Sequence, residues 1–405
     1  MTDCRICNSK IEKFMSFGDM PIANGFLMPD QFNDEYSYEL APAFCSNCGA
    51  FQLIEQPRPE QMFHDNYAFF AGTSQVMMDH FQELADIARD RYLDGDDPFV
   101  VEIGSNDGGM IETMDSHGIR HLGIEPSGNV ADAARAKGLN VWTEFFNEDL
   151  ADKIIAEYGH ADVFLGANVL AHIGEIQPVV AGIAKLLKPK GVMITEDPYL
   201  GEMVRKTGYD QIYDEHVFIF SLRSMQSLAA LHGMEVIDVE PLPTAGGSMR
   251  YYICRKGERP VSDSVRNLAA QETEKGLEKP ETYDQFRRNC EKSRSDLLEI
   301  LNTAKAEGKR VVGYGATSKS TTVNIYCGIT SDLVEFISDT TPTKQGKFSP
   351  GAHVPVKPHE DFVANYPDFA LLYAWNHREE IMAKEDAYGA AGGKWIVYVP
   401  KLEVF

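Results

Sequence analysis

The feature of this sequence that most constrains its fold is a strand–glycine loop–helix pattern that occurs twice. Residues 98–103 form an apolar run that ends at Gly104, and residues 309–314 form a second run that ends at Gly315. Residues with helical spacing follow each run. Units of this kind place parallel strands side by side, with helices covering the sheet. The sequence therefore predicts an α/β protein with two separate Rossmann-like sheets.

A chain of 405 residues is too long to fold around one core, and this one divides into three segments. Residues 1–75 contain two cysteine pairs. Residues 76–256 carry most of the strand–helix alternation, and residues 257–405 begin with a charged helical stretch and continue into the second glycine loop. The predicted strands are 98–103, 121–125, 161–166, 191–196, 234–239, 249–254, 309–314, 333–339 and 369–375, with helices at 130–137 and 176–187.

Four cysteines in the first segment have the spacing of a zinc site. Cys4 and Cys7 are separated by two residues, and so are Cys45 and Cys48. Each pair can place two thiolates on one tight turn, and two such turns supply a tetrahedral set of ligands for Zn²⁺. The alternative, four unrelated thiols, is disfavoured by the paired spacing. Because all four ligands are sulfur, we predict a structural zinc with no open position.

The net charge of −23 limits the possible partners. The chain has 38 basic and 61 acidic side chains without a basic stripe, so we expect no nucleic-acid partner. A few placed Lys or Arg residues could still bind a small phosphorylated ligand. No apolar run reaches the length of about 18 residues that spans a membrane, and the N-terminus lacks the apolar core of a secretory signal. We expect a cytoplasmic protein without membrane contact, as a monomer or weak homo-oligomer.

The first glycine loop carries an acid that a dinucleotide site would not have. Its glycines, Gly104, Gly108 and Gly109, do not follow the dinucleotide spacing, and Glu102 stands just before the first. A carboxylate there suits the cationic ammonium and sulfonium of S-adenosylmethionine, and Glu125, at the end of the next strand, is placed to accept the ribose hydroxyls. We predict this cofactor; the alternative is a tight turn without a ligand. The rest of the predicted set is Asn106, Asp107, Pro126, Ser127, Phe146, Asn147 and Asn168, with Phe146 and Asn147 near the adenine.

Side chains that handle protons gather after the strand predicted at 191–196. Tyr213, Glu215 and His216 follow it, at the end of the strands where open α/β sheets place their sites. His216 could take a proton from a carbon acid, Tyr213 could donate to an enolate oxygen, and Glu215 could hold a hydroxyl. His172 follows another strand and is expected to face the same site. The alternative is a solvated polar loop with incidental histidines.

These motifs resemble the family of S-adenosylmethionine-dependent sugar C-methyltransferases that act on nucleotide-linked 4-keto-6-deoxy sugars. The resemblance covers nearly the whole chain. It implies a class I methyltransferase domain between an N-terminal zinc-binding domain and a C-terminal Rossmann-like domain. It also implies that His216 is the base and that Tyr213, Glu215, His172 and Tyr67 lie at the reacting sugar. Its most specific parts are Glu196-Asp-Pro-Tyr-Leu, Tyr213-Asp-Glu-His216, Gly246-Gly-Ser-Met-Arg250 and Gly313-Tyr-Gly-Ala-Thr-Ser-Lys319. The family often has histidine at the position of Ala245, so no side-chain role is expected there.

The resemblance implies a nucleoside-diphosphate sugar as the substrate. A ketone at C-4 acidifies the neighbouring C–H bond, so a base can form an enolate whose carbon receives the methyl group. We expect methylation at C-3, with C-5 as in some relatives the alternative, and the nucleotide stays open. The reaction needs no metal, in keeping with a closed zinc site. The predicted substrate contacts are Tyr199, Arg250, Thr317, Ser318 and Lys319, the last three at a helix N-terminus suited to a diphosphate.

Other functions are compatible with parts of the pattern. An O- or N-methyltransferase would use the same cofactor loop without a base for a carbon acid. A zinc-ribbon scaffold would carry an inactive methyltransferase domain and bind no S-adenosylmethionine. A nicotinamide enzyme would use the loop at Gly313 and Gly315, which lacks a third glycine at the usual spacing.

Overall fold

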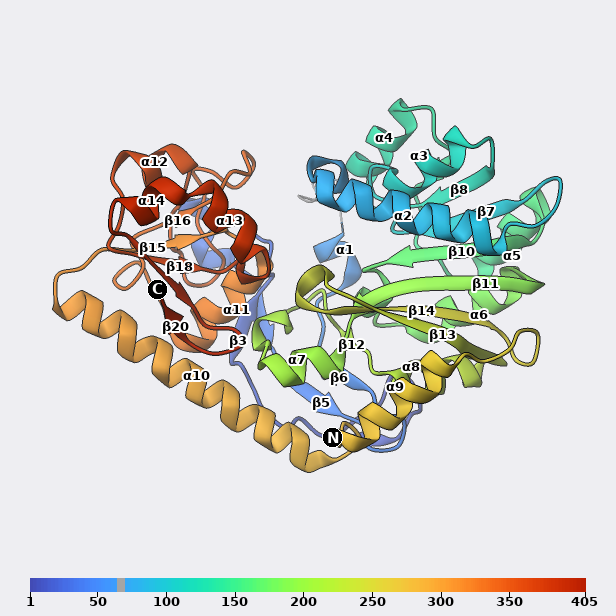
Figure 1. The fold of residues 1–405 in the computed structure, drawn as a ribbon, viewed down its shortest axis with the longest axis horizontal. Coiled ribbons are helices and arrows are strands. Elements are labelled where there is room, and N and C mark those ends of the chain that lie inside the picture. The colour runs from blue at the N-terminus through green and yellow to red at the C-terminus, as the bar shows by residue number, and fades with distance from the viewer. Residues whose placement is uncertain (64–69) are drawn as a thin grey trace.

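The computed structural model describes residues 1–63 and 70–405 and consists of two α/β lobes (Figure 1). The larger lobe contains a seven-stranded sheet and the smaller, C-terminal lobe a six-stranded sheet. The N-terminal segment lies between them. The predicted α/β class is therefore confirmed. Within the described ranges, no helix combines the length and the apolar character needed to cross a bilayer.

The seven-stranded sheet has the order β13-β14-β11-β10-β7-β8-β9. The five strands β11, β10, β7, β8 and β9 are parallel, whereas β14 is antiparallel to both of its neighbours. If these seven strands are numbered along the chain and read from the β9 edge, the order is 3-2-1-4-5-7-6. The last strand, β14, therefore lies between the fifth and the sixth. The strands are β7 (Phe99–Ile103), β8 (Arg120–Ile124), β9 (Val141–Trp142), β10 (Ala161–Ala167), β11 (Leu187–Pro198), β13 (Met234–Leu242) and β14 (Ser248–Arg255).

Helices cover both faces of this sheet, which explains why its central strands are apolar throughout. Along β7, Val100 packs toward α2 while Phe99 and Val101 pack toward α5, α6 and α8, because successive side chains of a strand point to opposite faces. The helices of this lobe are α2 (Gln75–Tyr92), α3 (Gly109–Ser116), α4 (Gly128–Ala136), α5 (Glu148–Tyr158), α6 (Ile176–Leu186), α7 (Leu200–Lys206), α8 (Leu222–Leu231) and α9 (Asp263–Glu274).

The N-terminal segment shares a sheet with the large lobe. Strand β12 (Phe218–Ile219) belongs to the large lobe, yet it pairs with β6 (Phe51–Leu53) of the N-terminal segment. The Leu53 amide also donates to the Val217 carbonyl at 2.8 Å. The chain just after His216 is therefore held by the N-terminal segment. The other elements of this segment are β1 (Thr2–Asp3), β2 (Lys10–Ile11), β3 (Asp19–Pro21), β4 (Ser37–Glu39), β5 (Pro42–Phe44) and α1 (Pro59–Met62).

The C-terminal lobe is a second, smaller doubly wound sheet in the order β17-β16-β15-β18-β19-β20. The strand predicted at 333–339 is wrong in its first half, because the Leu333 and Val334 amides bond to the Thr330 carbonyl in a turn. The run predicted at 369–375 is a strand only to Leu372. The elements are β15 (Val311–Tyr314), β16 (Ile337–Ser338), β17 (Val356–Lys357), β18 (Phe369–Leu372), β19 (Lys394–Val397), β20 (Glu403–Val404), α11 (Ser318–Cys327), α12 (His359–Ala364), α13 (Arg378–Lys384) and α14 (Asp386–Ala390).

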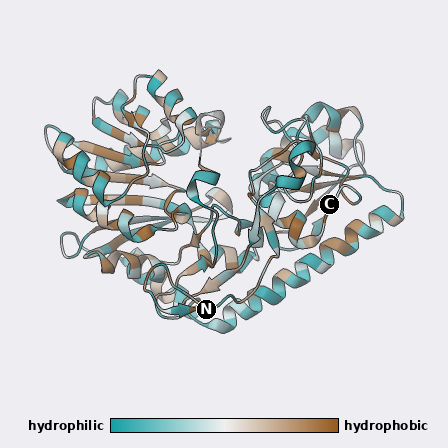
Figure 2. Cartoon of the chain, turned by 180° about the vertical axis from the view of Figure 1, so that it is seen from behind, coloured by the Kyte–Doolittle hydropathy of each residue, from teal (hydrophilic) through white to brown (hydrophobic). Residues whose placement is uncertain are grey.

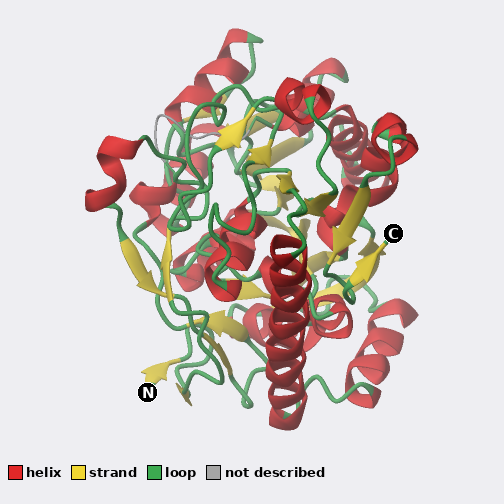
Figure 3. Cartoon of the chain, turned by 90° about the vertical axis from the view of Figure 1, so that its left-hand side faces the viewer, coloured by secondary structure: helices red, strands yellow, loops and turns green. Residues whose placement is uncertain are grey.

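Helix α10 (Pro280–Ala306) runs along one side of the molecule and spans both lobes (Figure 1, Figure 3). Its buried residues are spaced three, four or seven positions apart and form one face, so apolar and polar patches alternate along it (Figure 2). Tyr283 near its start stacks on Phe44 of the N-terminal segment, with ring centroids 4.0 Å apart. Leu297 and Leu301 pack into the C-terminal lobe. The helix therefore ties the two ends of the molecule together.

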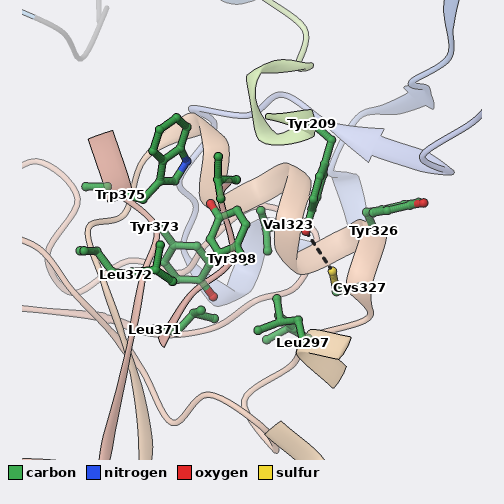
Figure 4. Close-up of a cluster of buried hydrophobic side chains, with 14 of the residues drawn as sticks. Tyr209, Leu297, Val323, Tyr326, Cys327, Leu371, Leu372, Tyr373, Trp375 and Tyr398 are labelled. Atoms are coloured by element: carbon green, nitrogen blue, oxygen red, sulfur yellow. Dashed lines mark hydrogen bonds between the residues drawn. The ribbon is translucent and has the colours of Figure 1, made fainter. Parts of the chain in front are cut away.

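One aromatic cluster joins all three segments. Tyr209 of the large lobe lies among side chains of the C-terminal lobe, and its hydroxyl is 3.8 Å from the Cys327 sulfur (Figure 4). Phe17 of the N-terminal segment stacks on Tyr209, and its ring centroid lies 4.8 Å from that of Tyr326. Buried aromatic contacts of this kind make the three segments one packed body. Residues next to Tyr209 are therefore held rigidly between the lobes.

Candidate active site

The four paired cysteines meet in one place. Their sulfur atoms all lie within 4.8 Å of one another, with 3.6 Å between Cys4 and Cys48 and 3.5 Å between Cys7 and Cys45. Sulfurs around a tetrahedral zinc lie about 3.8 Å apart, since each Zn–S bond is about 2.3 Å. The Gln52 amide donates to the Cys4 sulfur at 3.0 Å, as an outer partner of a metal ligand does. The donor set fits Zn²⁺, as predicted.

The glycines of the first loop are required by its backbone. Gly104 has a φ of 60°, and a Cβ there would lie 2.4 Å from the Val169 side chain. Gly108, at the N-cap of α3, has a φ of 91°, and its Cβ would meet Leu139 at 2.3 Å. Side chains at either position would push the loop away from the sheet. The loop can therefore lie close to a ligand only because both residues are glycine.

Two carboxyl groups flank this loop. Glu102 is 3% exposed, and its Oε2 has no hydrogen-bond partner among the described residues. Glu125 accepts the Asn106 amide at 3.0 Å and the Ser127 amide at 2.8 Å. Burial raises the pKa of both groups, that of Glu102 well above its ordinary value. A buried carboxyl oxygen without a partner, as at Glu102, suits a cationic ligand, so the site fits S-adenosylmethionine.

The loop is covered by residues that the sequence did not point to. The 3₁₀ turn η2 (Ala71–Thr73) lies against it: the Asn106 side chain accepts the Ala71 amide at 2.9 Å, and Asp107 accepts the Gly72 amide at 3.1 Å. A Cβ on Gly72 would lie 2.5 Å from the Asp107 carboxylate. The predicted cofactor residues Asn106 and Asp107 thus also anchor the chain that leads into α2.

The remaining predicted cofactor residues follow β8, β9 and β10. Phe146 is buried with its ring 5.1 Å from Phe164, and Asn147 caps α5 by accepting the Leu150 amide at 2.9 Å. Asn168 has a φ of 55°, and its amide donates to the Glu196 carbonyl. Pro126 and Ser127 continue directly from Glu125. The structure therefore places this whole set at the carboxyl ends of the parallel strands.

His216 lies in a dense set of hydrogen bonds and ring contacts. Its Nδ1 lies 2.6 Å from the Gln211 carbonyl, which can only accept, so Nδ1 carries the proton and Nε2 has the lone pair. The Tyr213 hydroxyl donates to that Nε2 at 2.9 Å, and the His172 ring stacks on His216 with centroids 5.4 Å apart. Burial, His172 and Lys319 lower the pKa of His216 well below its ordinary value. The imidazole is neutral and can accept a proton.

Burial also sets the protonation states of the two rings beside His216, those of His172 and Tyr213. Burial lowers the pKa of His172 to about 4, so this ring is neutral as well, and its Nε2 has no partner within the described parts of the chain. Burial raises the pKa of Tyr213, which keeps its hydroxyl protonated. Glu215 accepts from the Asn24 side chain at 2.8 Å. The structure thus brings together Tyr213, Glu215, His216 and His172, whereas Tyr67 lies outside the described residues.

The C-terminal lobe holds the loop that carries this cluster. Asp210, in the 3₁₀ turn η4 (Tyr209–Gln211), accepts from the Trp375 indole at 2.5 Å and from the Tyr398 hydroxyl at 2.8 Å. The first glycine of the Gly246–Gly247 pair lies against the same tryptophan. Gly246 has a φ of 84°, and a Cβ there would lie 2.6 Å from the Trp375 ring. Spacing alone did not reveal Asp210 or Trp375 as supports of the site.

The predicted substrate residues fall into two groups. Lys319 lies near His216, where it donates to Asn376 at 2.9 Å and sits over the Trp375 ring. Thr317 and Ser318 begin α11, and the Thr317 hydroxyl caps that helix. Tyr199 and Arg250 are buried in structural networks instead: Tyr199 donates to Glu272 at 3.0 Å, and Arg250 bonds to Glu196 and Glu240, which leaves only its Nη2 without a partner among the described residues.

This sheet order, with two carboxylates at the first glycine loop and a four-cysteine metal site in the N-terminal segment, defines a zinc-bearing S-adenosylmethionine-dependent methyltransferase. Three family models match the chain: a zinc binding domain at residues 4–63, a methyltransferase domain at 74–239, and a C-methyltransferase C-terminal domain at 243–400. The C-methyltransferase NovU of Streptomyces niveus is 32% identical over 405 residues, which is 99% of this chain and 96% of NovU. The chain belongs to this three-part C-methyltransferase family.

Solved methyltransferase structures resemble part of the chain. The mitomycin 7-O-methyltransferase MmcR is 21% identical with a TM-score of 0.35, over 45% of this chain and 55% of MmcR. The magnesium protoporphyrin IX methyltransferase ChlM of Synechocystis PCC 6803 is 14% identical with a TM-score of 0.35, over 45% of this chain and 88% of ChlM.

Proposed function

We propose that this enzyme methylates the carbon next to the ketone, at C-3, of a nucleoside-diphosphate 4-keto-6-deoxy sugar, with His216 as the base. The observation that carries the proposal is the state of His216. Its Nδ1 is held by the Gln211 carbonyl, and its Nε2 lone pair is buried beside Tyr213 and His172. A neutral imidazole oriented in this way is the group that a carbon acid requires. An O- or N-methyltransferase needs no base for a carbon acid.

The residues have distinct roles in this reaction. His216 Nε2 takes the C-3 proton, and the electron pair of the broken C–H bond forms an enolate with its charge on the C-4 oxygen. The Tyr213 hydroxyl, which the sugar displaces from Nε2, donates to that oxygen. Glu215 orients a sugar hydroxyl. When bound at the Glu102 and Glu125 loop, S-adenosylmethionine supplies the methyl group that replaces the proton, and the rest of the cofactor leaves as a neutral thioether.

Two lysines of the C-terminal lobe suit the diphosphate of the substrate. Lys319 lies close enough to His216 to lower the pKa of that imidazole, and Lys344 is close to Glu215. Both ammonium groups are largely removed from solvent, which lowers their own pKa values. An anion beside them would offset that cost. They place two cations beside His216 and Glu215 in a chain of net charge −23.

The base is tested by His216→Asn, in which an amide replaces the imidazole. We expect the rate of methyl transfer to nucleotide-linked 4-keto-6-deoxy sugars to fall by about 10²–10⁴-fold, as for loss of a general base. Exchange of the proton next to the ketone for solvent deuterium should stop, while calorimetry gives an unchanged Kd for S-adenosylmethionine. His117→Asn, at an exposed histidine after α3, is the matched control.

Other outcomes would lead to other functions. Near-normal turnover of His216→Asn with intact cofactor binding would exclude the carbon-acid mechanism and favour an O- or N-methyltransferase. A wild-type protein that binds no S-adenosylmethionine would be a scaffold. We further propose the cytoplasm as the location, because Cys254, Cys290 and Cys327 are buried as unpaired thiols.

A further inference from the structure

A short loop of the N-terminal segment enters the active site between the two lobes. The Ala23 amide donates to Asp214 of the large lobe at 3.1 Å, and the Ala23 carbonyl accepts from Thr321 of α11 at 2.9 Å. The next residue, Asn24, donates through its side-chain amide to Glu215 Oε1 at 2.8 Å. Both lobes therefore clamp the loop, and its position delivers one amide group to a site carboxylate.

The surroundings of Glu215 show what this amide does. Glu215 is 6% exposed, and burial raises the pKa of its carboxyl group. The charged and titratable groups that face it are the buried Asp214, the Tyr213 hydroxyl and the Lys344 ammonium. Lys344 is held by its hydrogen bond to the Ala316 carbonyl at 2.8 Å. Of the residues that the structure describes, Asn24 is the one whose side chain donates a hydrogen bond to this carboxylate.

We propose that Asn24 is a positioning residue of the active site. Its amide fixes one oxygen of Glu215 and stabilises the ionised carboxylate, so that the other oxygen is oriented for a sugar hydroxyl. The inference rests on the proposed function, in which Glu215 orients the substrate. Asparagine suits this position because it is neutral and donates from a short side chain. An aspartate of the same size would place two carboxylates in contact.

The contact is tested without turnover by Asn24→Asp. Two adjacent carboxyls share one proton at low pH and repel each other once that proton is lost. We therefore expect the Tm of the variant to fall increasingly below that of the wild type as the pH is raised from 5 to 9 or so. Asn302→Asp, on the exposed side of α10, should run parallel to the wild type over the same range. A constant gap for Asn24→Asp would overturn the proposed contact.

The positioning role is tested with a nucleotide-linked 4-keto-6-deoxy sugar. We expect Asn24→Asp and Asn24→Ala to lower kcat/KM for the sugar by about 10- to 100-fold, as misplacement of a substrate-orienting group does. The Kd for S-adenosylmethionine should change less than about twofold. Asn24→Gln, which keeps the amide, should recover part of the activity. Asn24→Ala also covers the case in which Asn24→Asp does not fold.

The failures of the two proposals are distinguishable. If the wild type turns over no such sugar, the proposed function fails, and the pH series of Tm values still decides whether Asn24 supports Glu215. If the wild type is active and both Asn24 variants keep its kcat/KM, the positioning role is wrong while the function stands.

Discussion

The glycine loops after β7 and β15 share one backbone plan. Each places a glycine at positive φ just after a buried parallel strand, with 60° at Gly104 and 89° at Gly315. In each, an acid that follows the neighbouring strand accepts a loop amide: Glu125 from Asn106 at 3.0 Å, and Asp339 from Ala316 at 2.7 Å. Judged by their backbones, the two loops are equally suited to a ligand.

Their polar groups differ. At the first loop, Glu102 Oε2 and the Ser105 hydroxyl are buried without partners in the described chain. At the second loop the chain satisfies its own groups: Lys344 donates to the Ala316 carbonyl, and Thr317 caps α11. Buried polar groups without partners cost free energy and persist where a ligand completes them. We therefore propose that the first loop receives the cofactor, whereas the second holds the lobe together and presents Lys319.

The sharpest test of this difference is to add one methyl group to each loop. Gly104→Ala forces a strained φ and a contact with Val169, so the loop must shift away from the cofactor. We expect affinity for S-adenosylmethionine to fall by about 100-fold, which corresponds to about 3 kcal/mol. Gly315→Ala should leave that affinity within about twofold of the wild type. Calorimetry measures both, and equal losses would break the distinction between the loops.

A smaller effect is expected from the two acids that follow the neighbouring strands. Glu125→Gln replaces an acceptor of two backbone amides and of the predicted ribose hydroxyls with a weaker group. We expect it to weaken binding of S-adenosylmethionine by about 10- to 30-fold, as for loss of charged hydrogen bonds. Asp339→Asn is the matched control and should leave this Kd unchanged. Weaker cofactor binding in Asp339→Asn would assign a cofactor role to the second loop.

The smallest effect concerns stability and has opposite signs at the two loops. The pKa of Glu102 is raised by burial, so the folded protein binds its proton more tightly than the unfolded chain and loses stability as the pH rises above about 4.5. Glu102→Gln should therefore stabilise the free protein at pH 7 by about 1 kcal/mol or more, with the gain vanishing near pH 4. Asp339→Asn should destabilise by about 1 kcal/mol, because two amides lose a charged acceptor.

Thermal unfolding of both variants from pH 4 to about 8 provides the measurement. A gain for Glu102→Gln that is as large at pH 4 as at pH 7 would show that removal of its charge is not the cause. Destabilisation by Glu102→Gln at every pH would mean that the free protein supplies Glu102 with a partner.

The elements that could be predicted from the sequence are those that depend on local pattern. The buried strands β7, β8 and β10 lie within two residues of their predicted limits, because burial on both faces requires a continuous apolar run. The cysteine spacing likewise predicted the zinc site. The stretch at residue 333 was misjudged, because its apolar side chains are buried in a turn rather than in a strand.

The parts of the site that could not be predicted depend on contacts between distant residues. Asn24 reaches Glu215 across 191 positions, and Trp375 holds Asp210 across 165. An asparagine beside a glycine predicts a turn, and a tryptophan in an apolar run predicts a core position. Neither signal indicates which distant loop the side chain contacts. Tyr199 shows the converse: its motif suggested the substrate, but its hydroxyl is bonded to Glu272 of α9.

The sequence by itself determined the chemical inventory of this protein: four thiolates for zinc, two acids at a glycine loop for a cationic cofactor, and a Tyr–Glu–His group suited to a carbon acid. Residue types and short spacings suffice for this, because each group acts through its own functional atoms. The tertiary structure decided which nitrogen of His216 carries the lone pair, and which of two similar loops keeps polar groups without partners among the described residues. Both depend on hydrogen-bond partners and burial, which are set only when the folded chain brings its elements together.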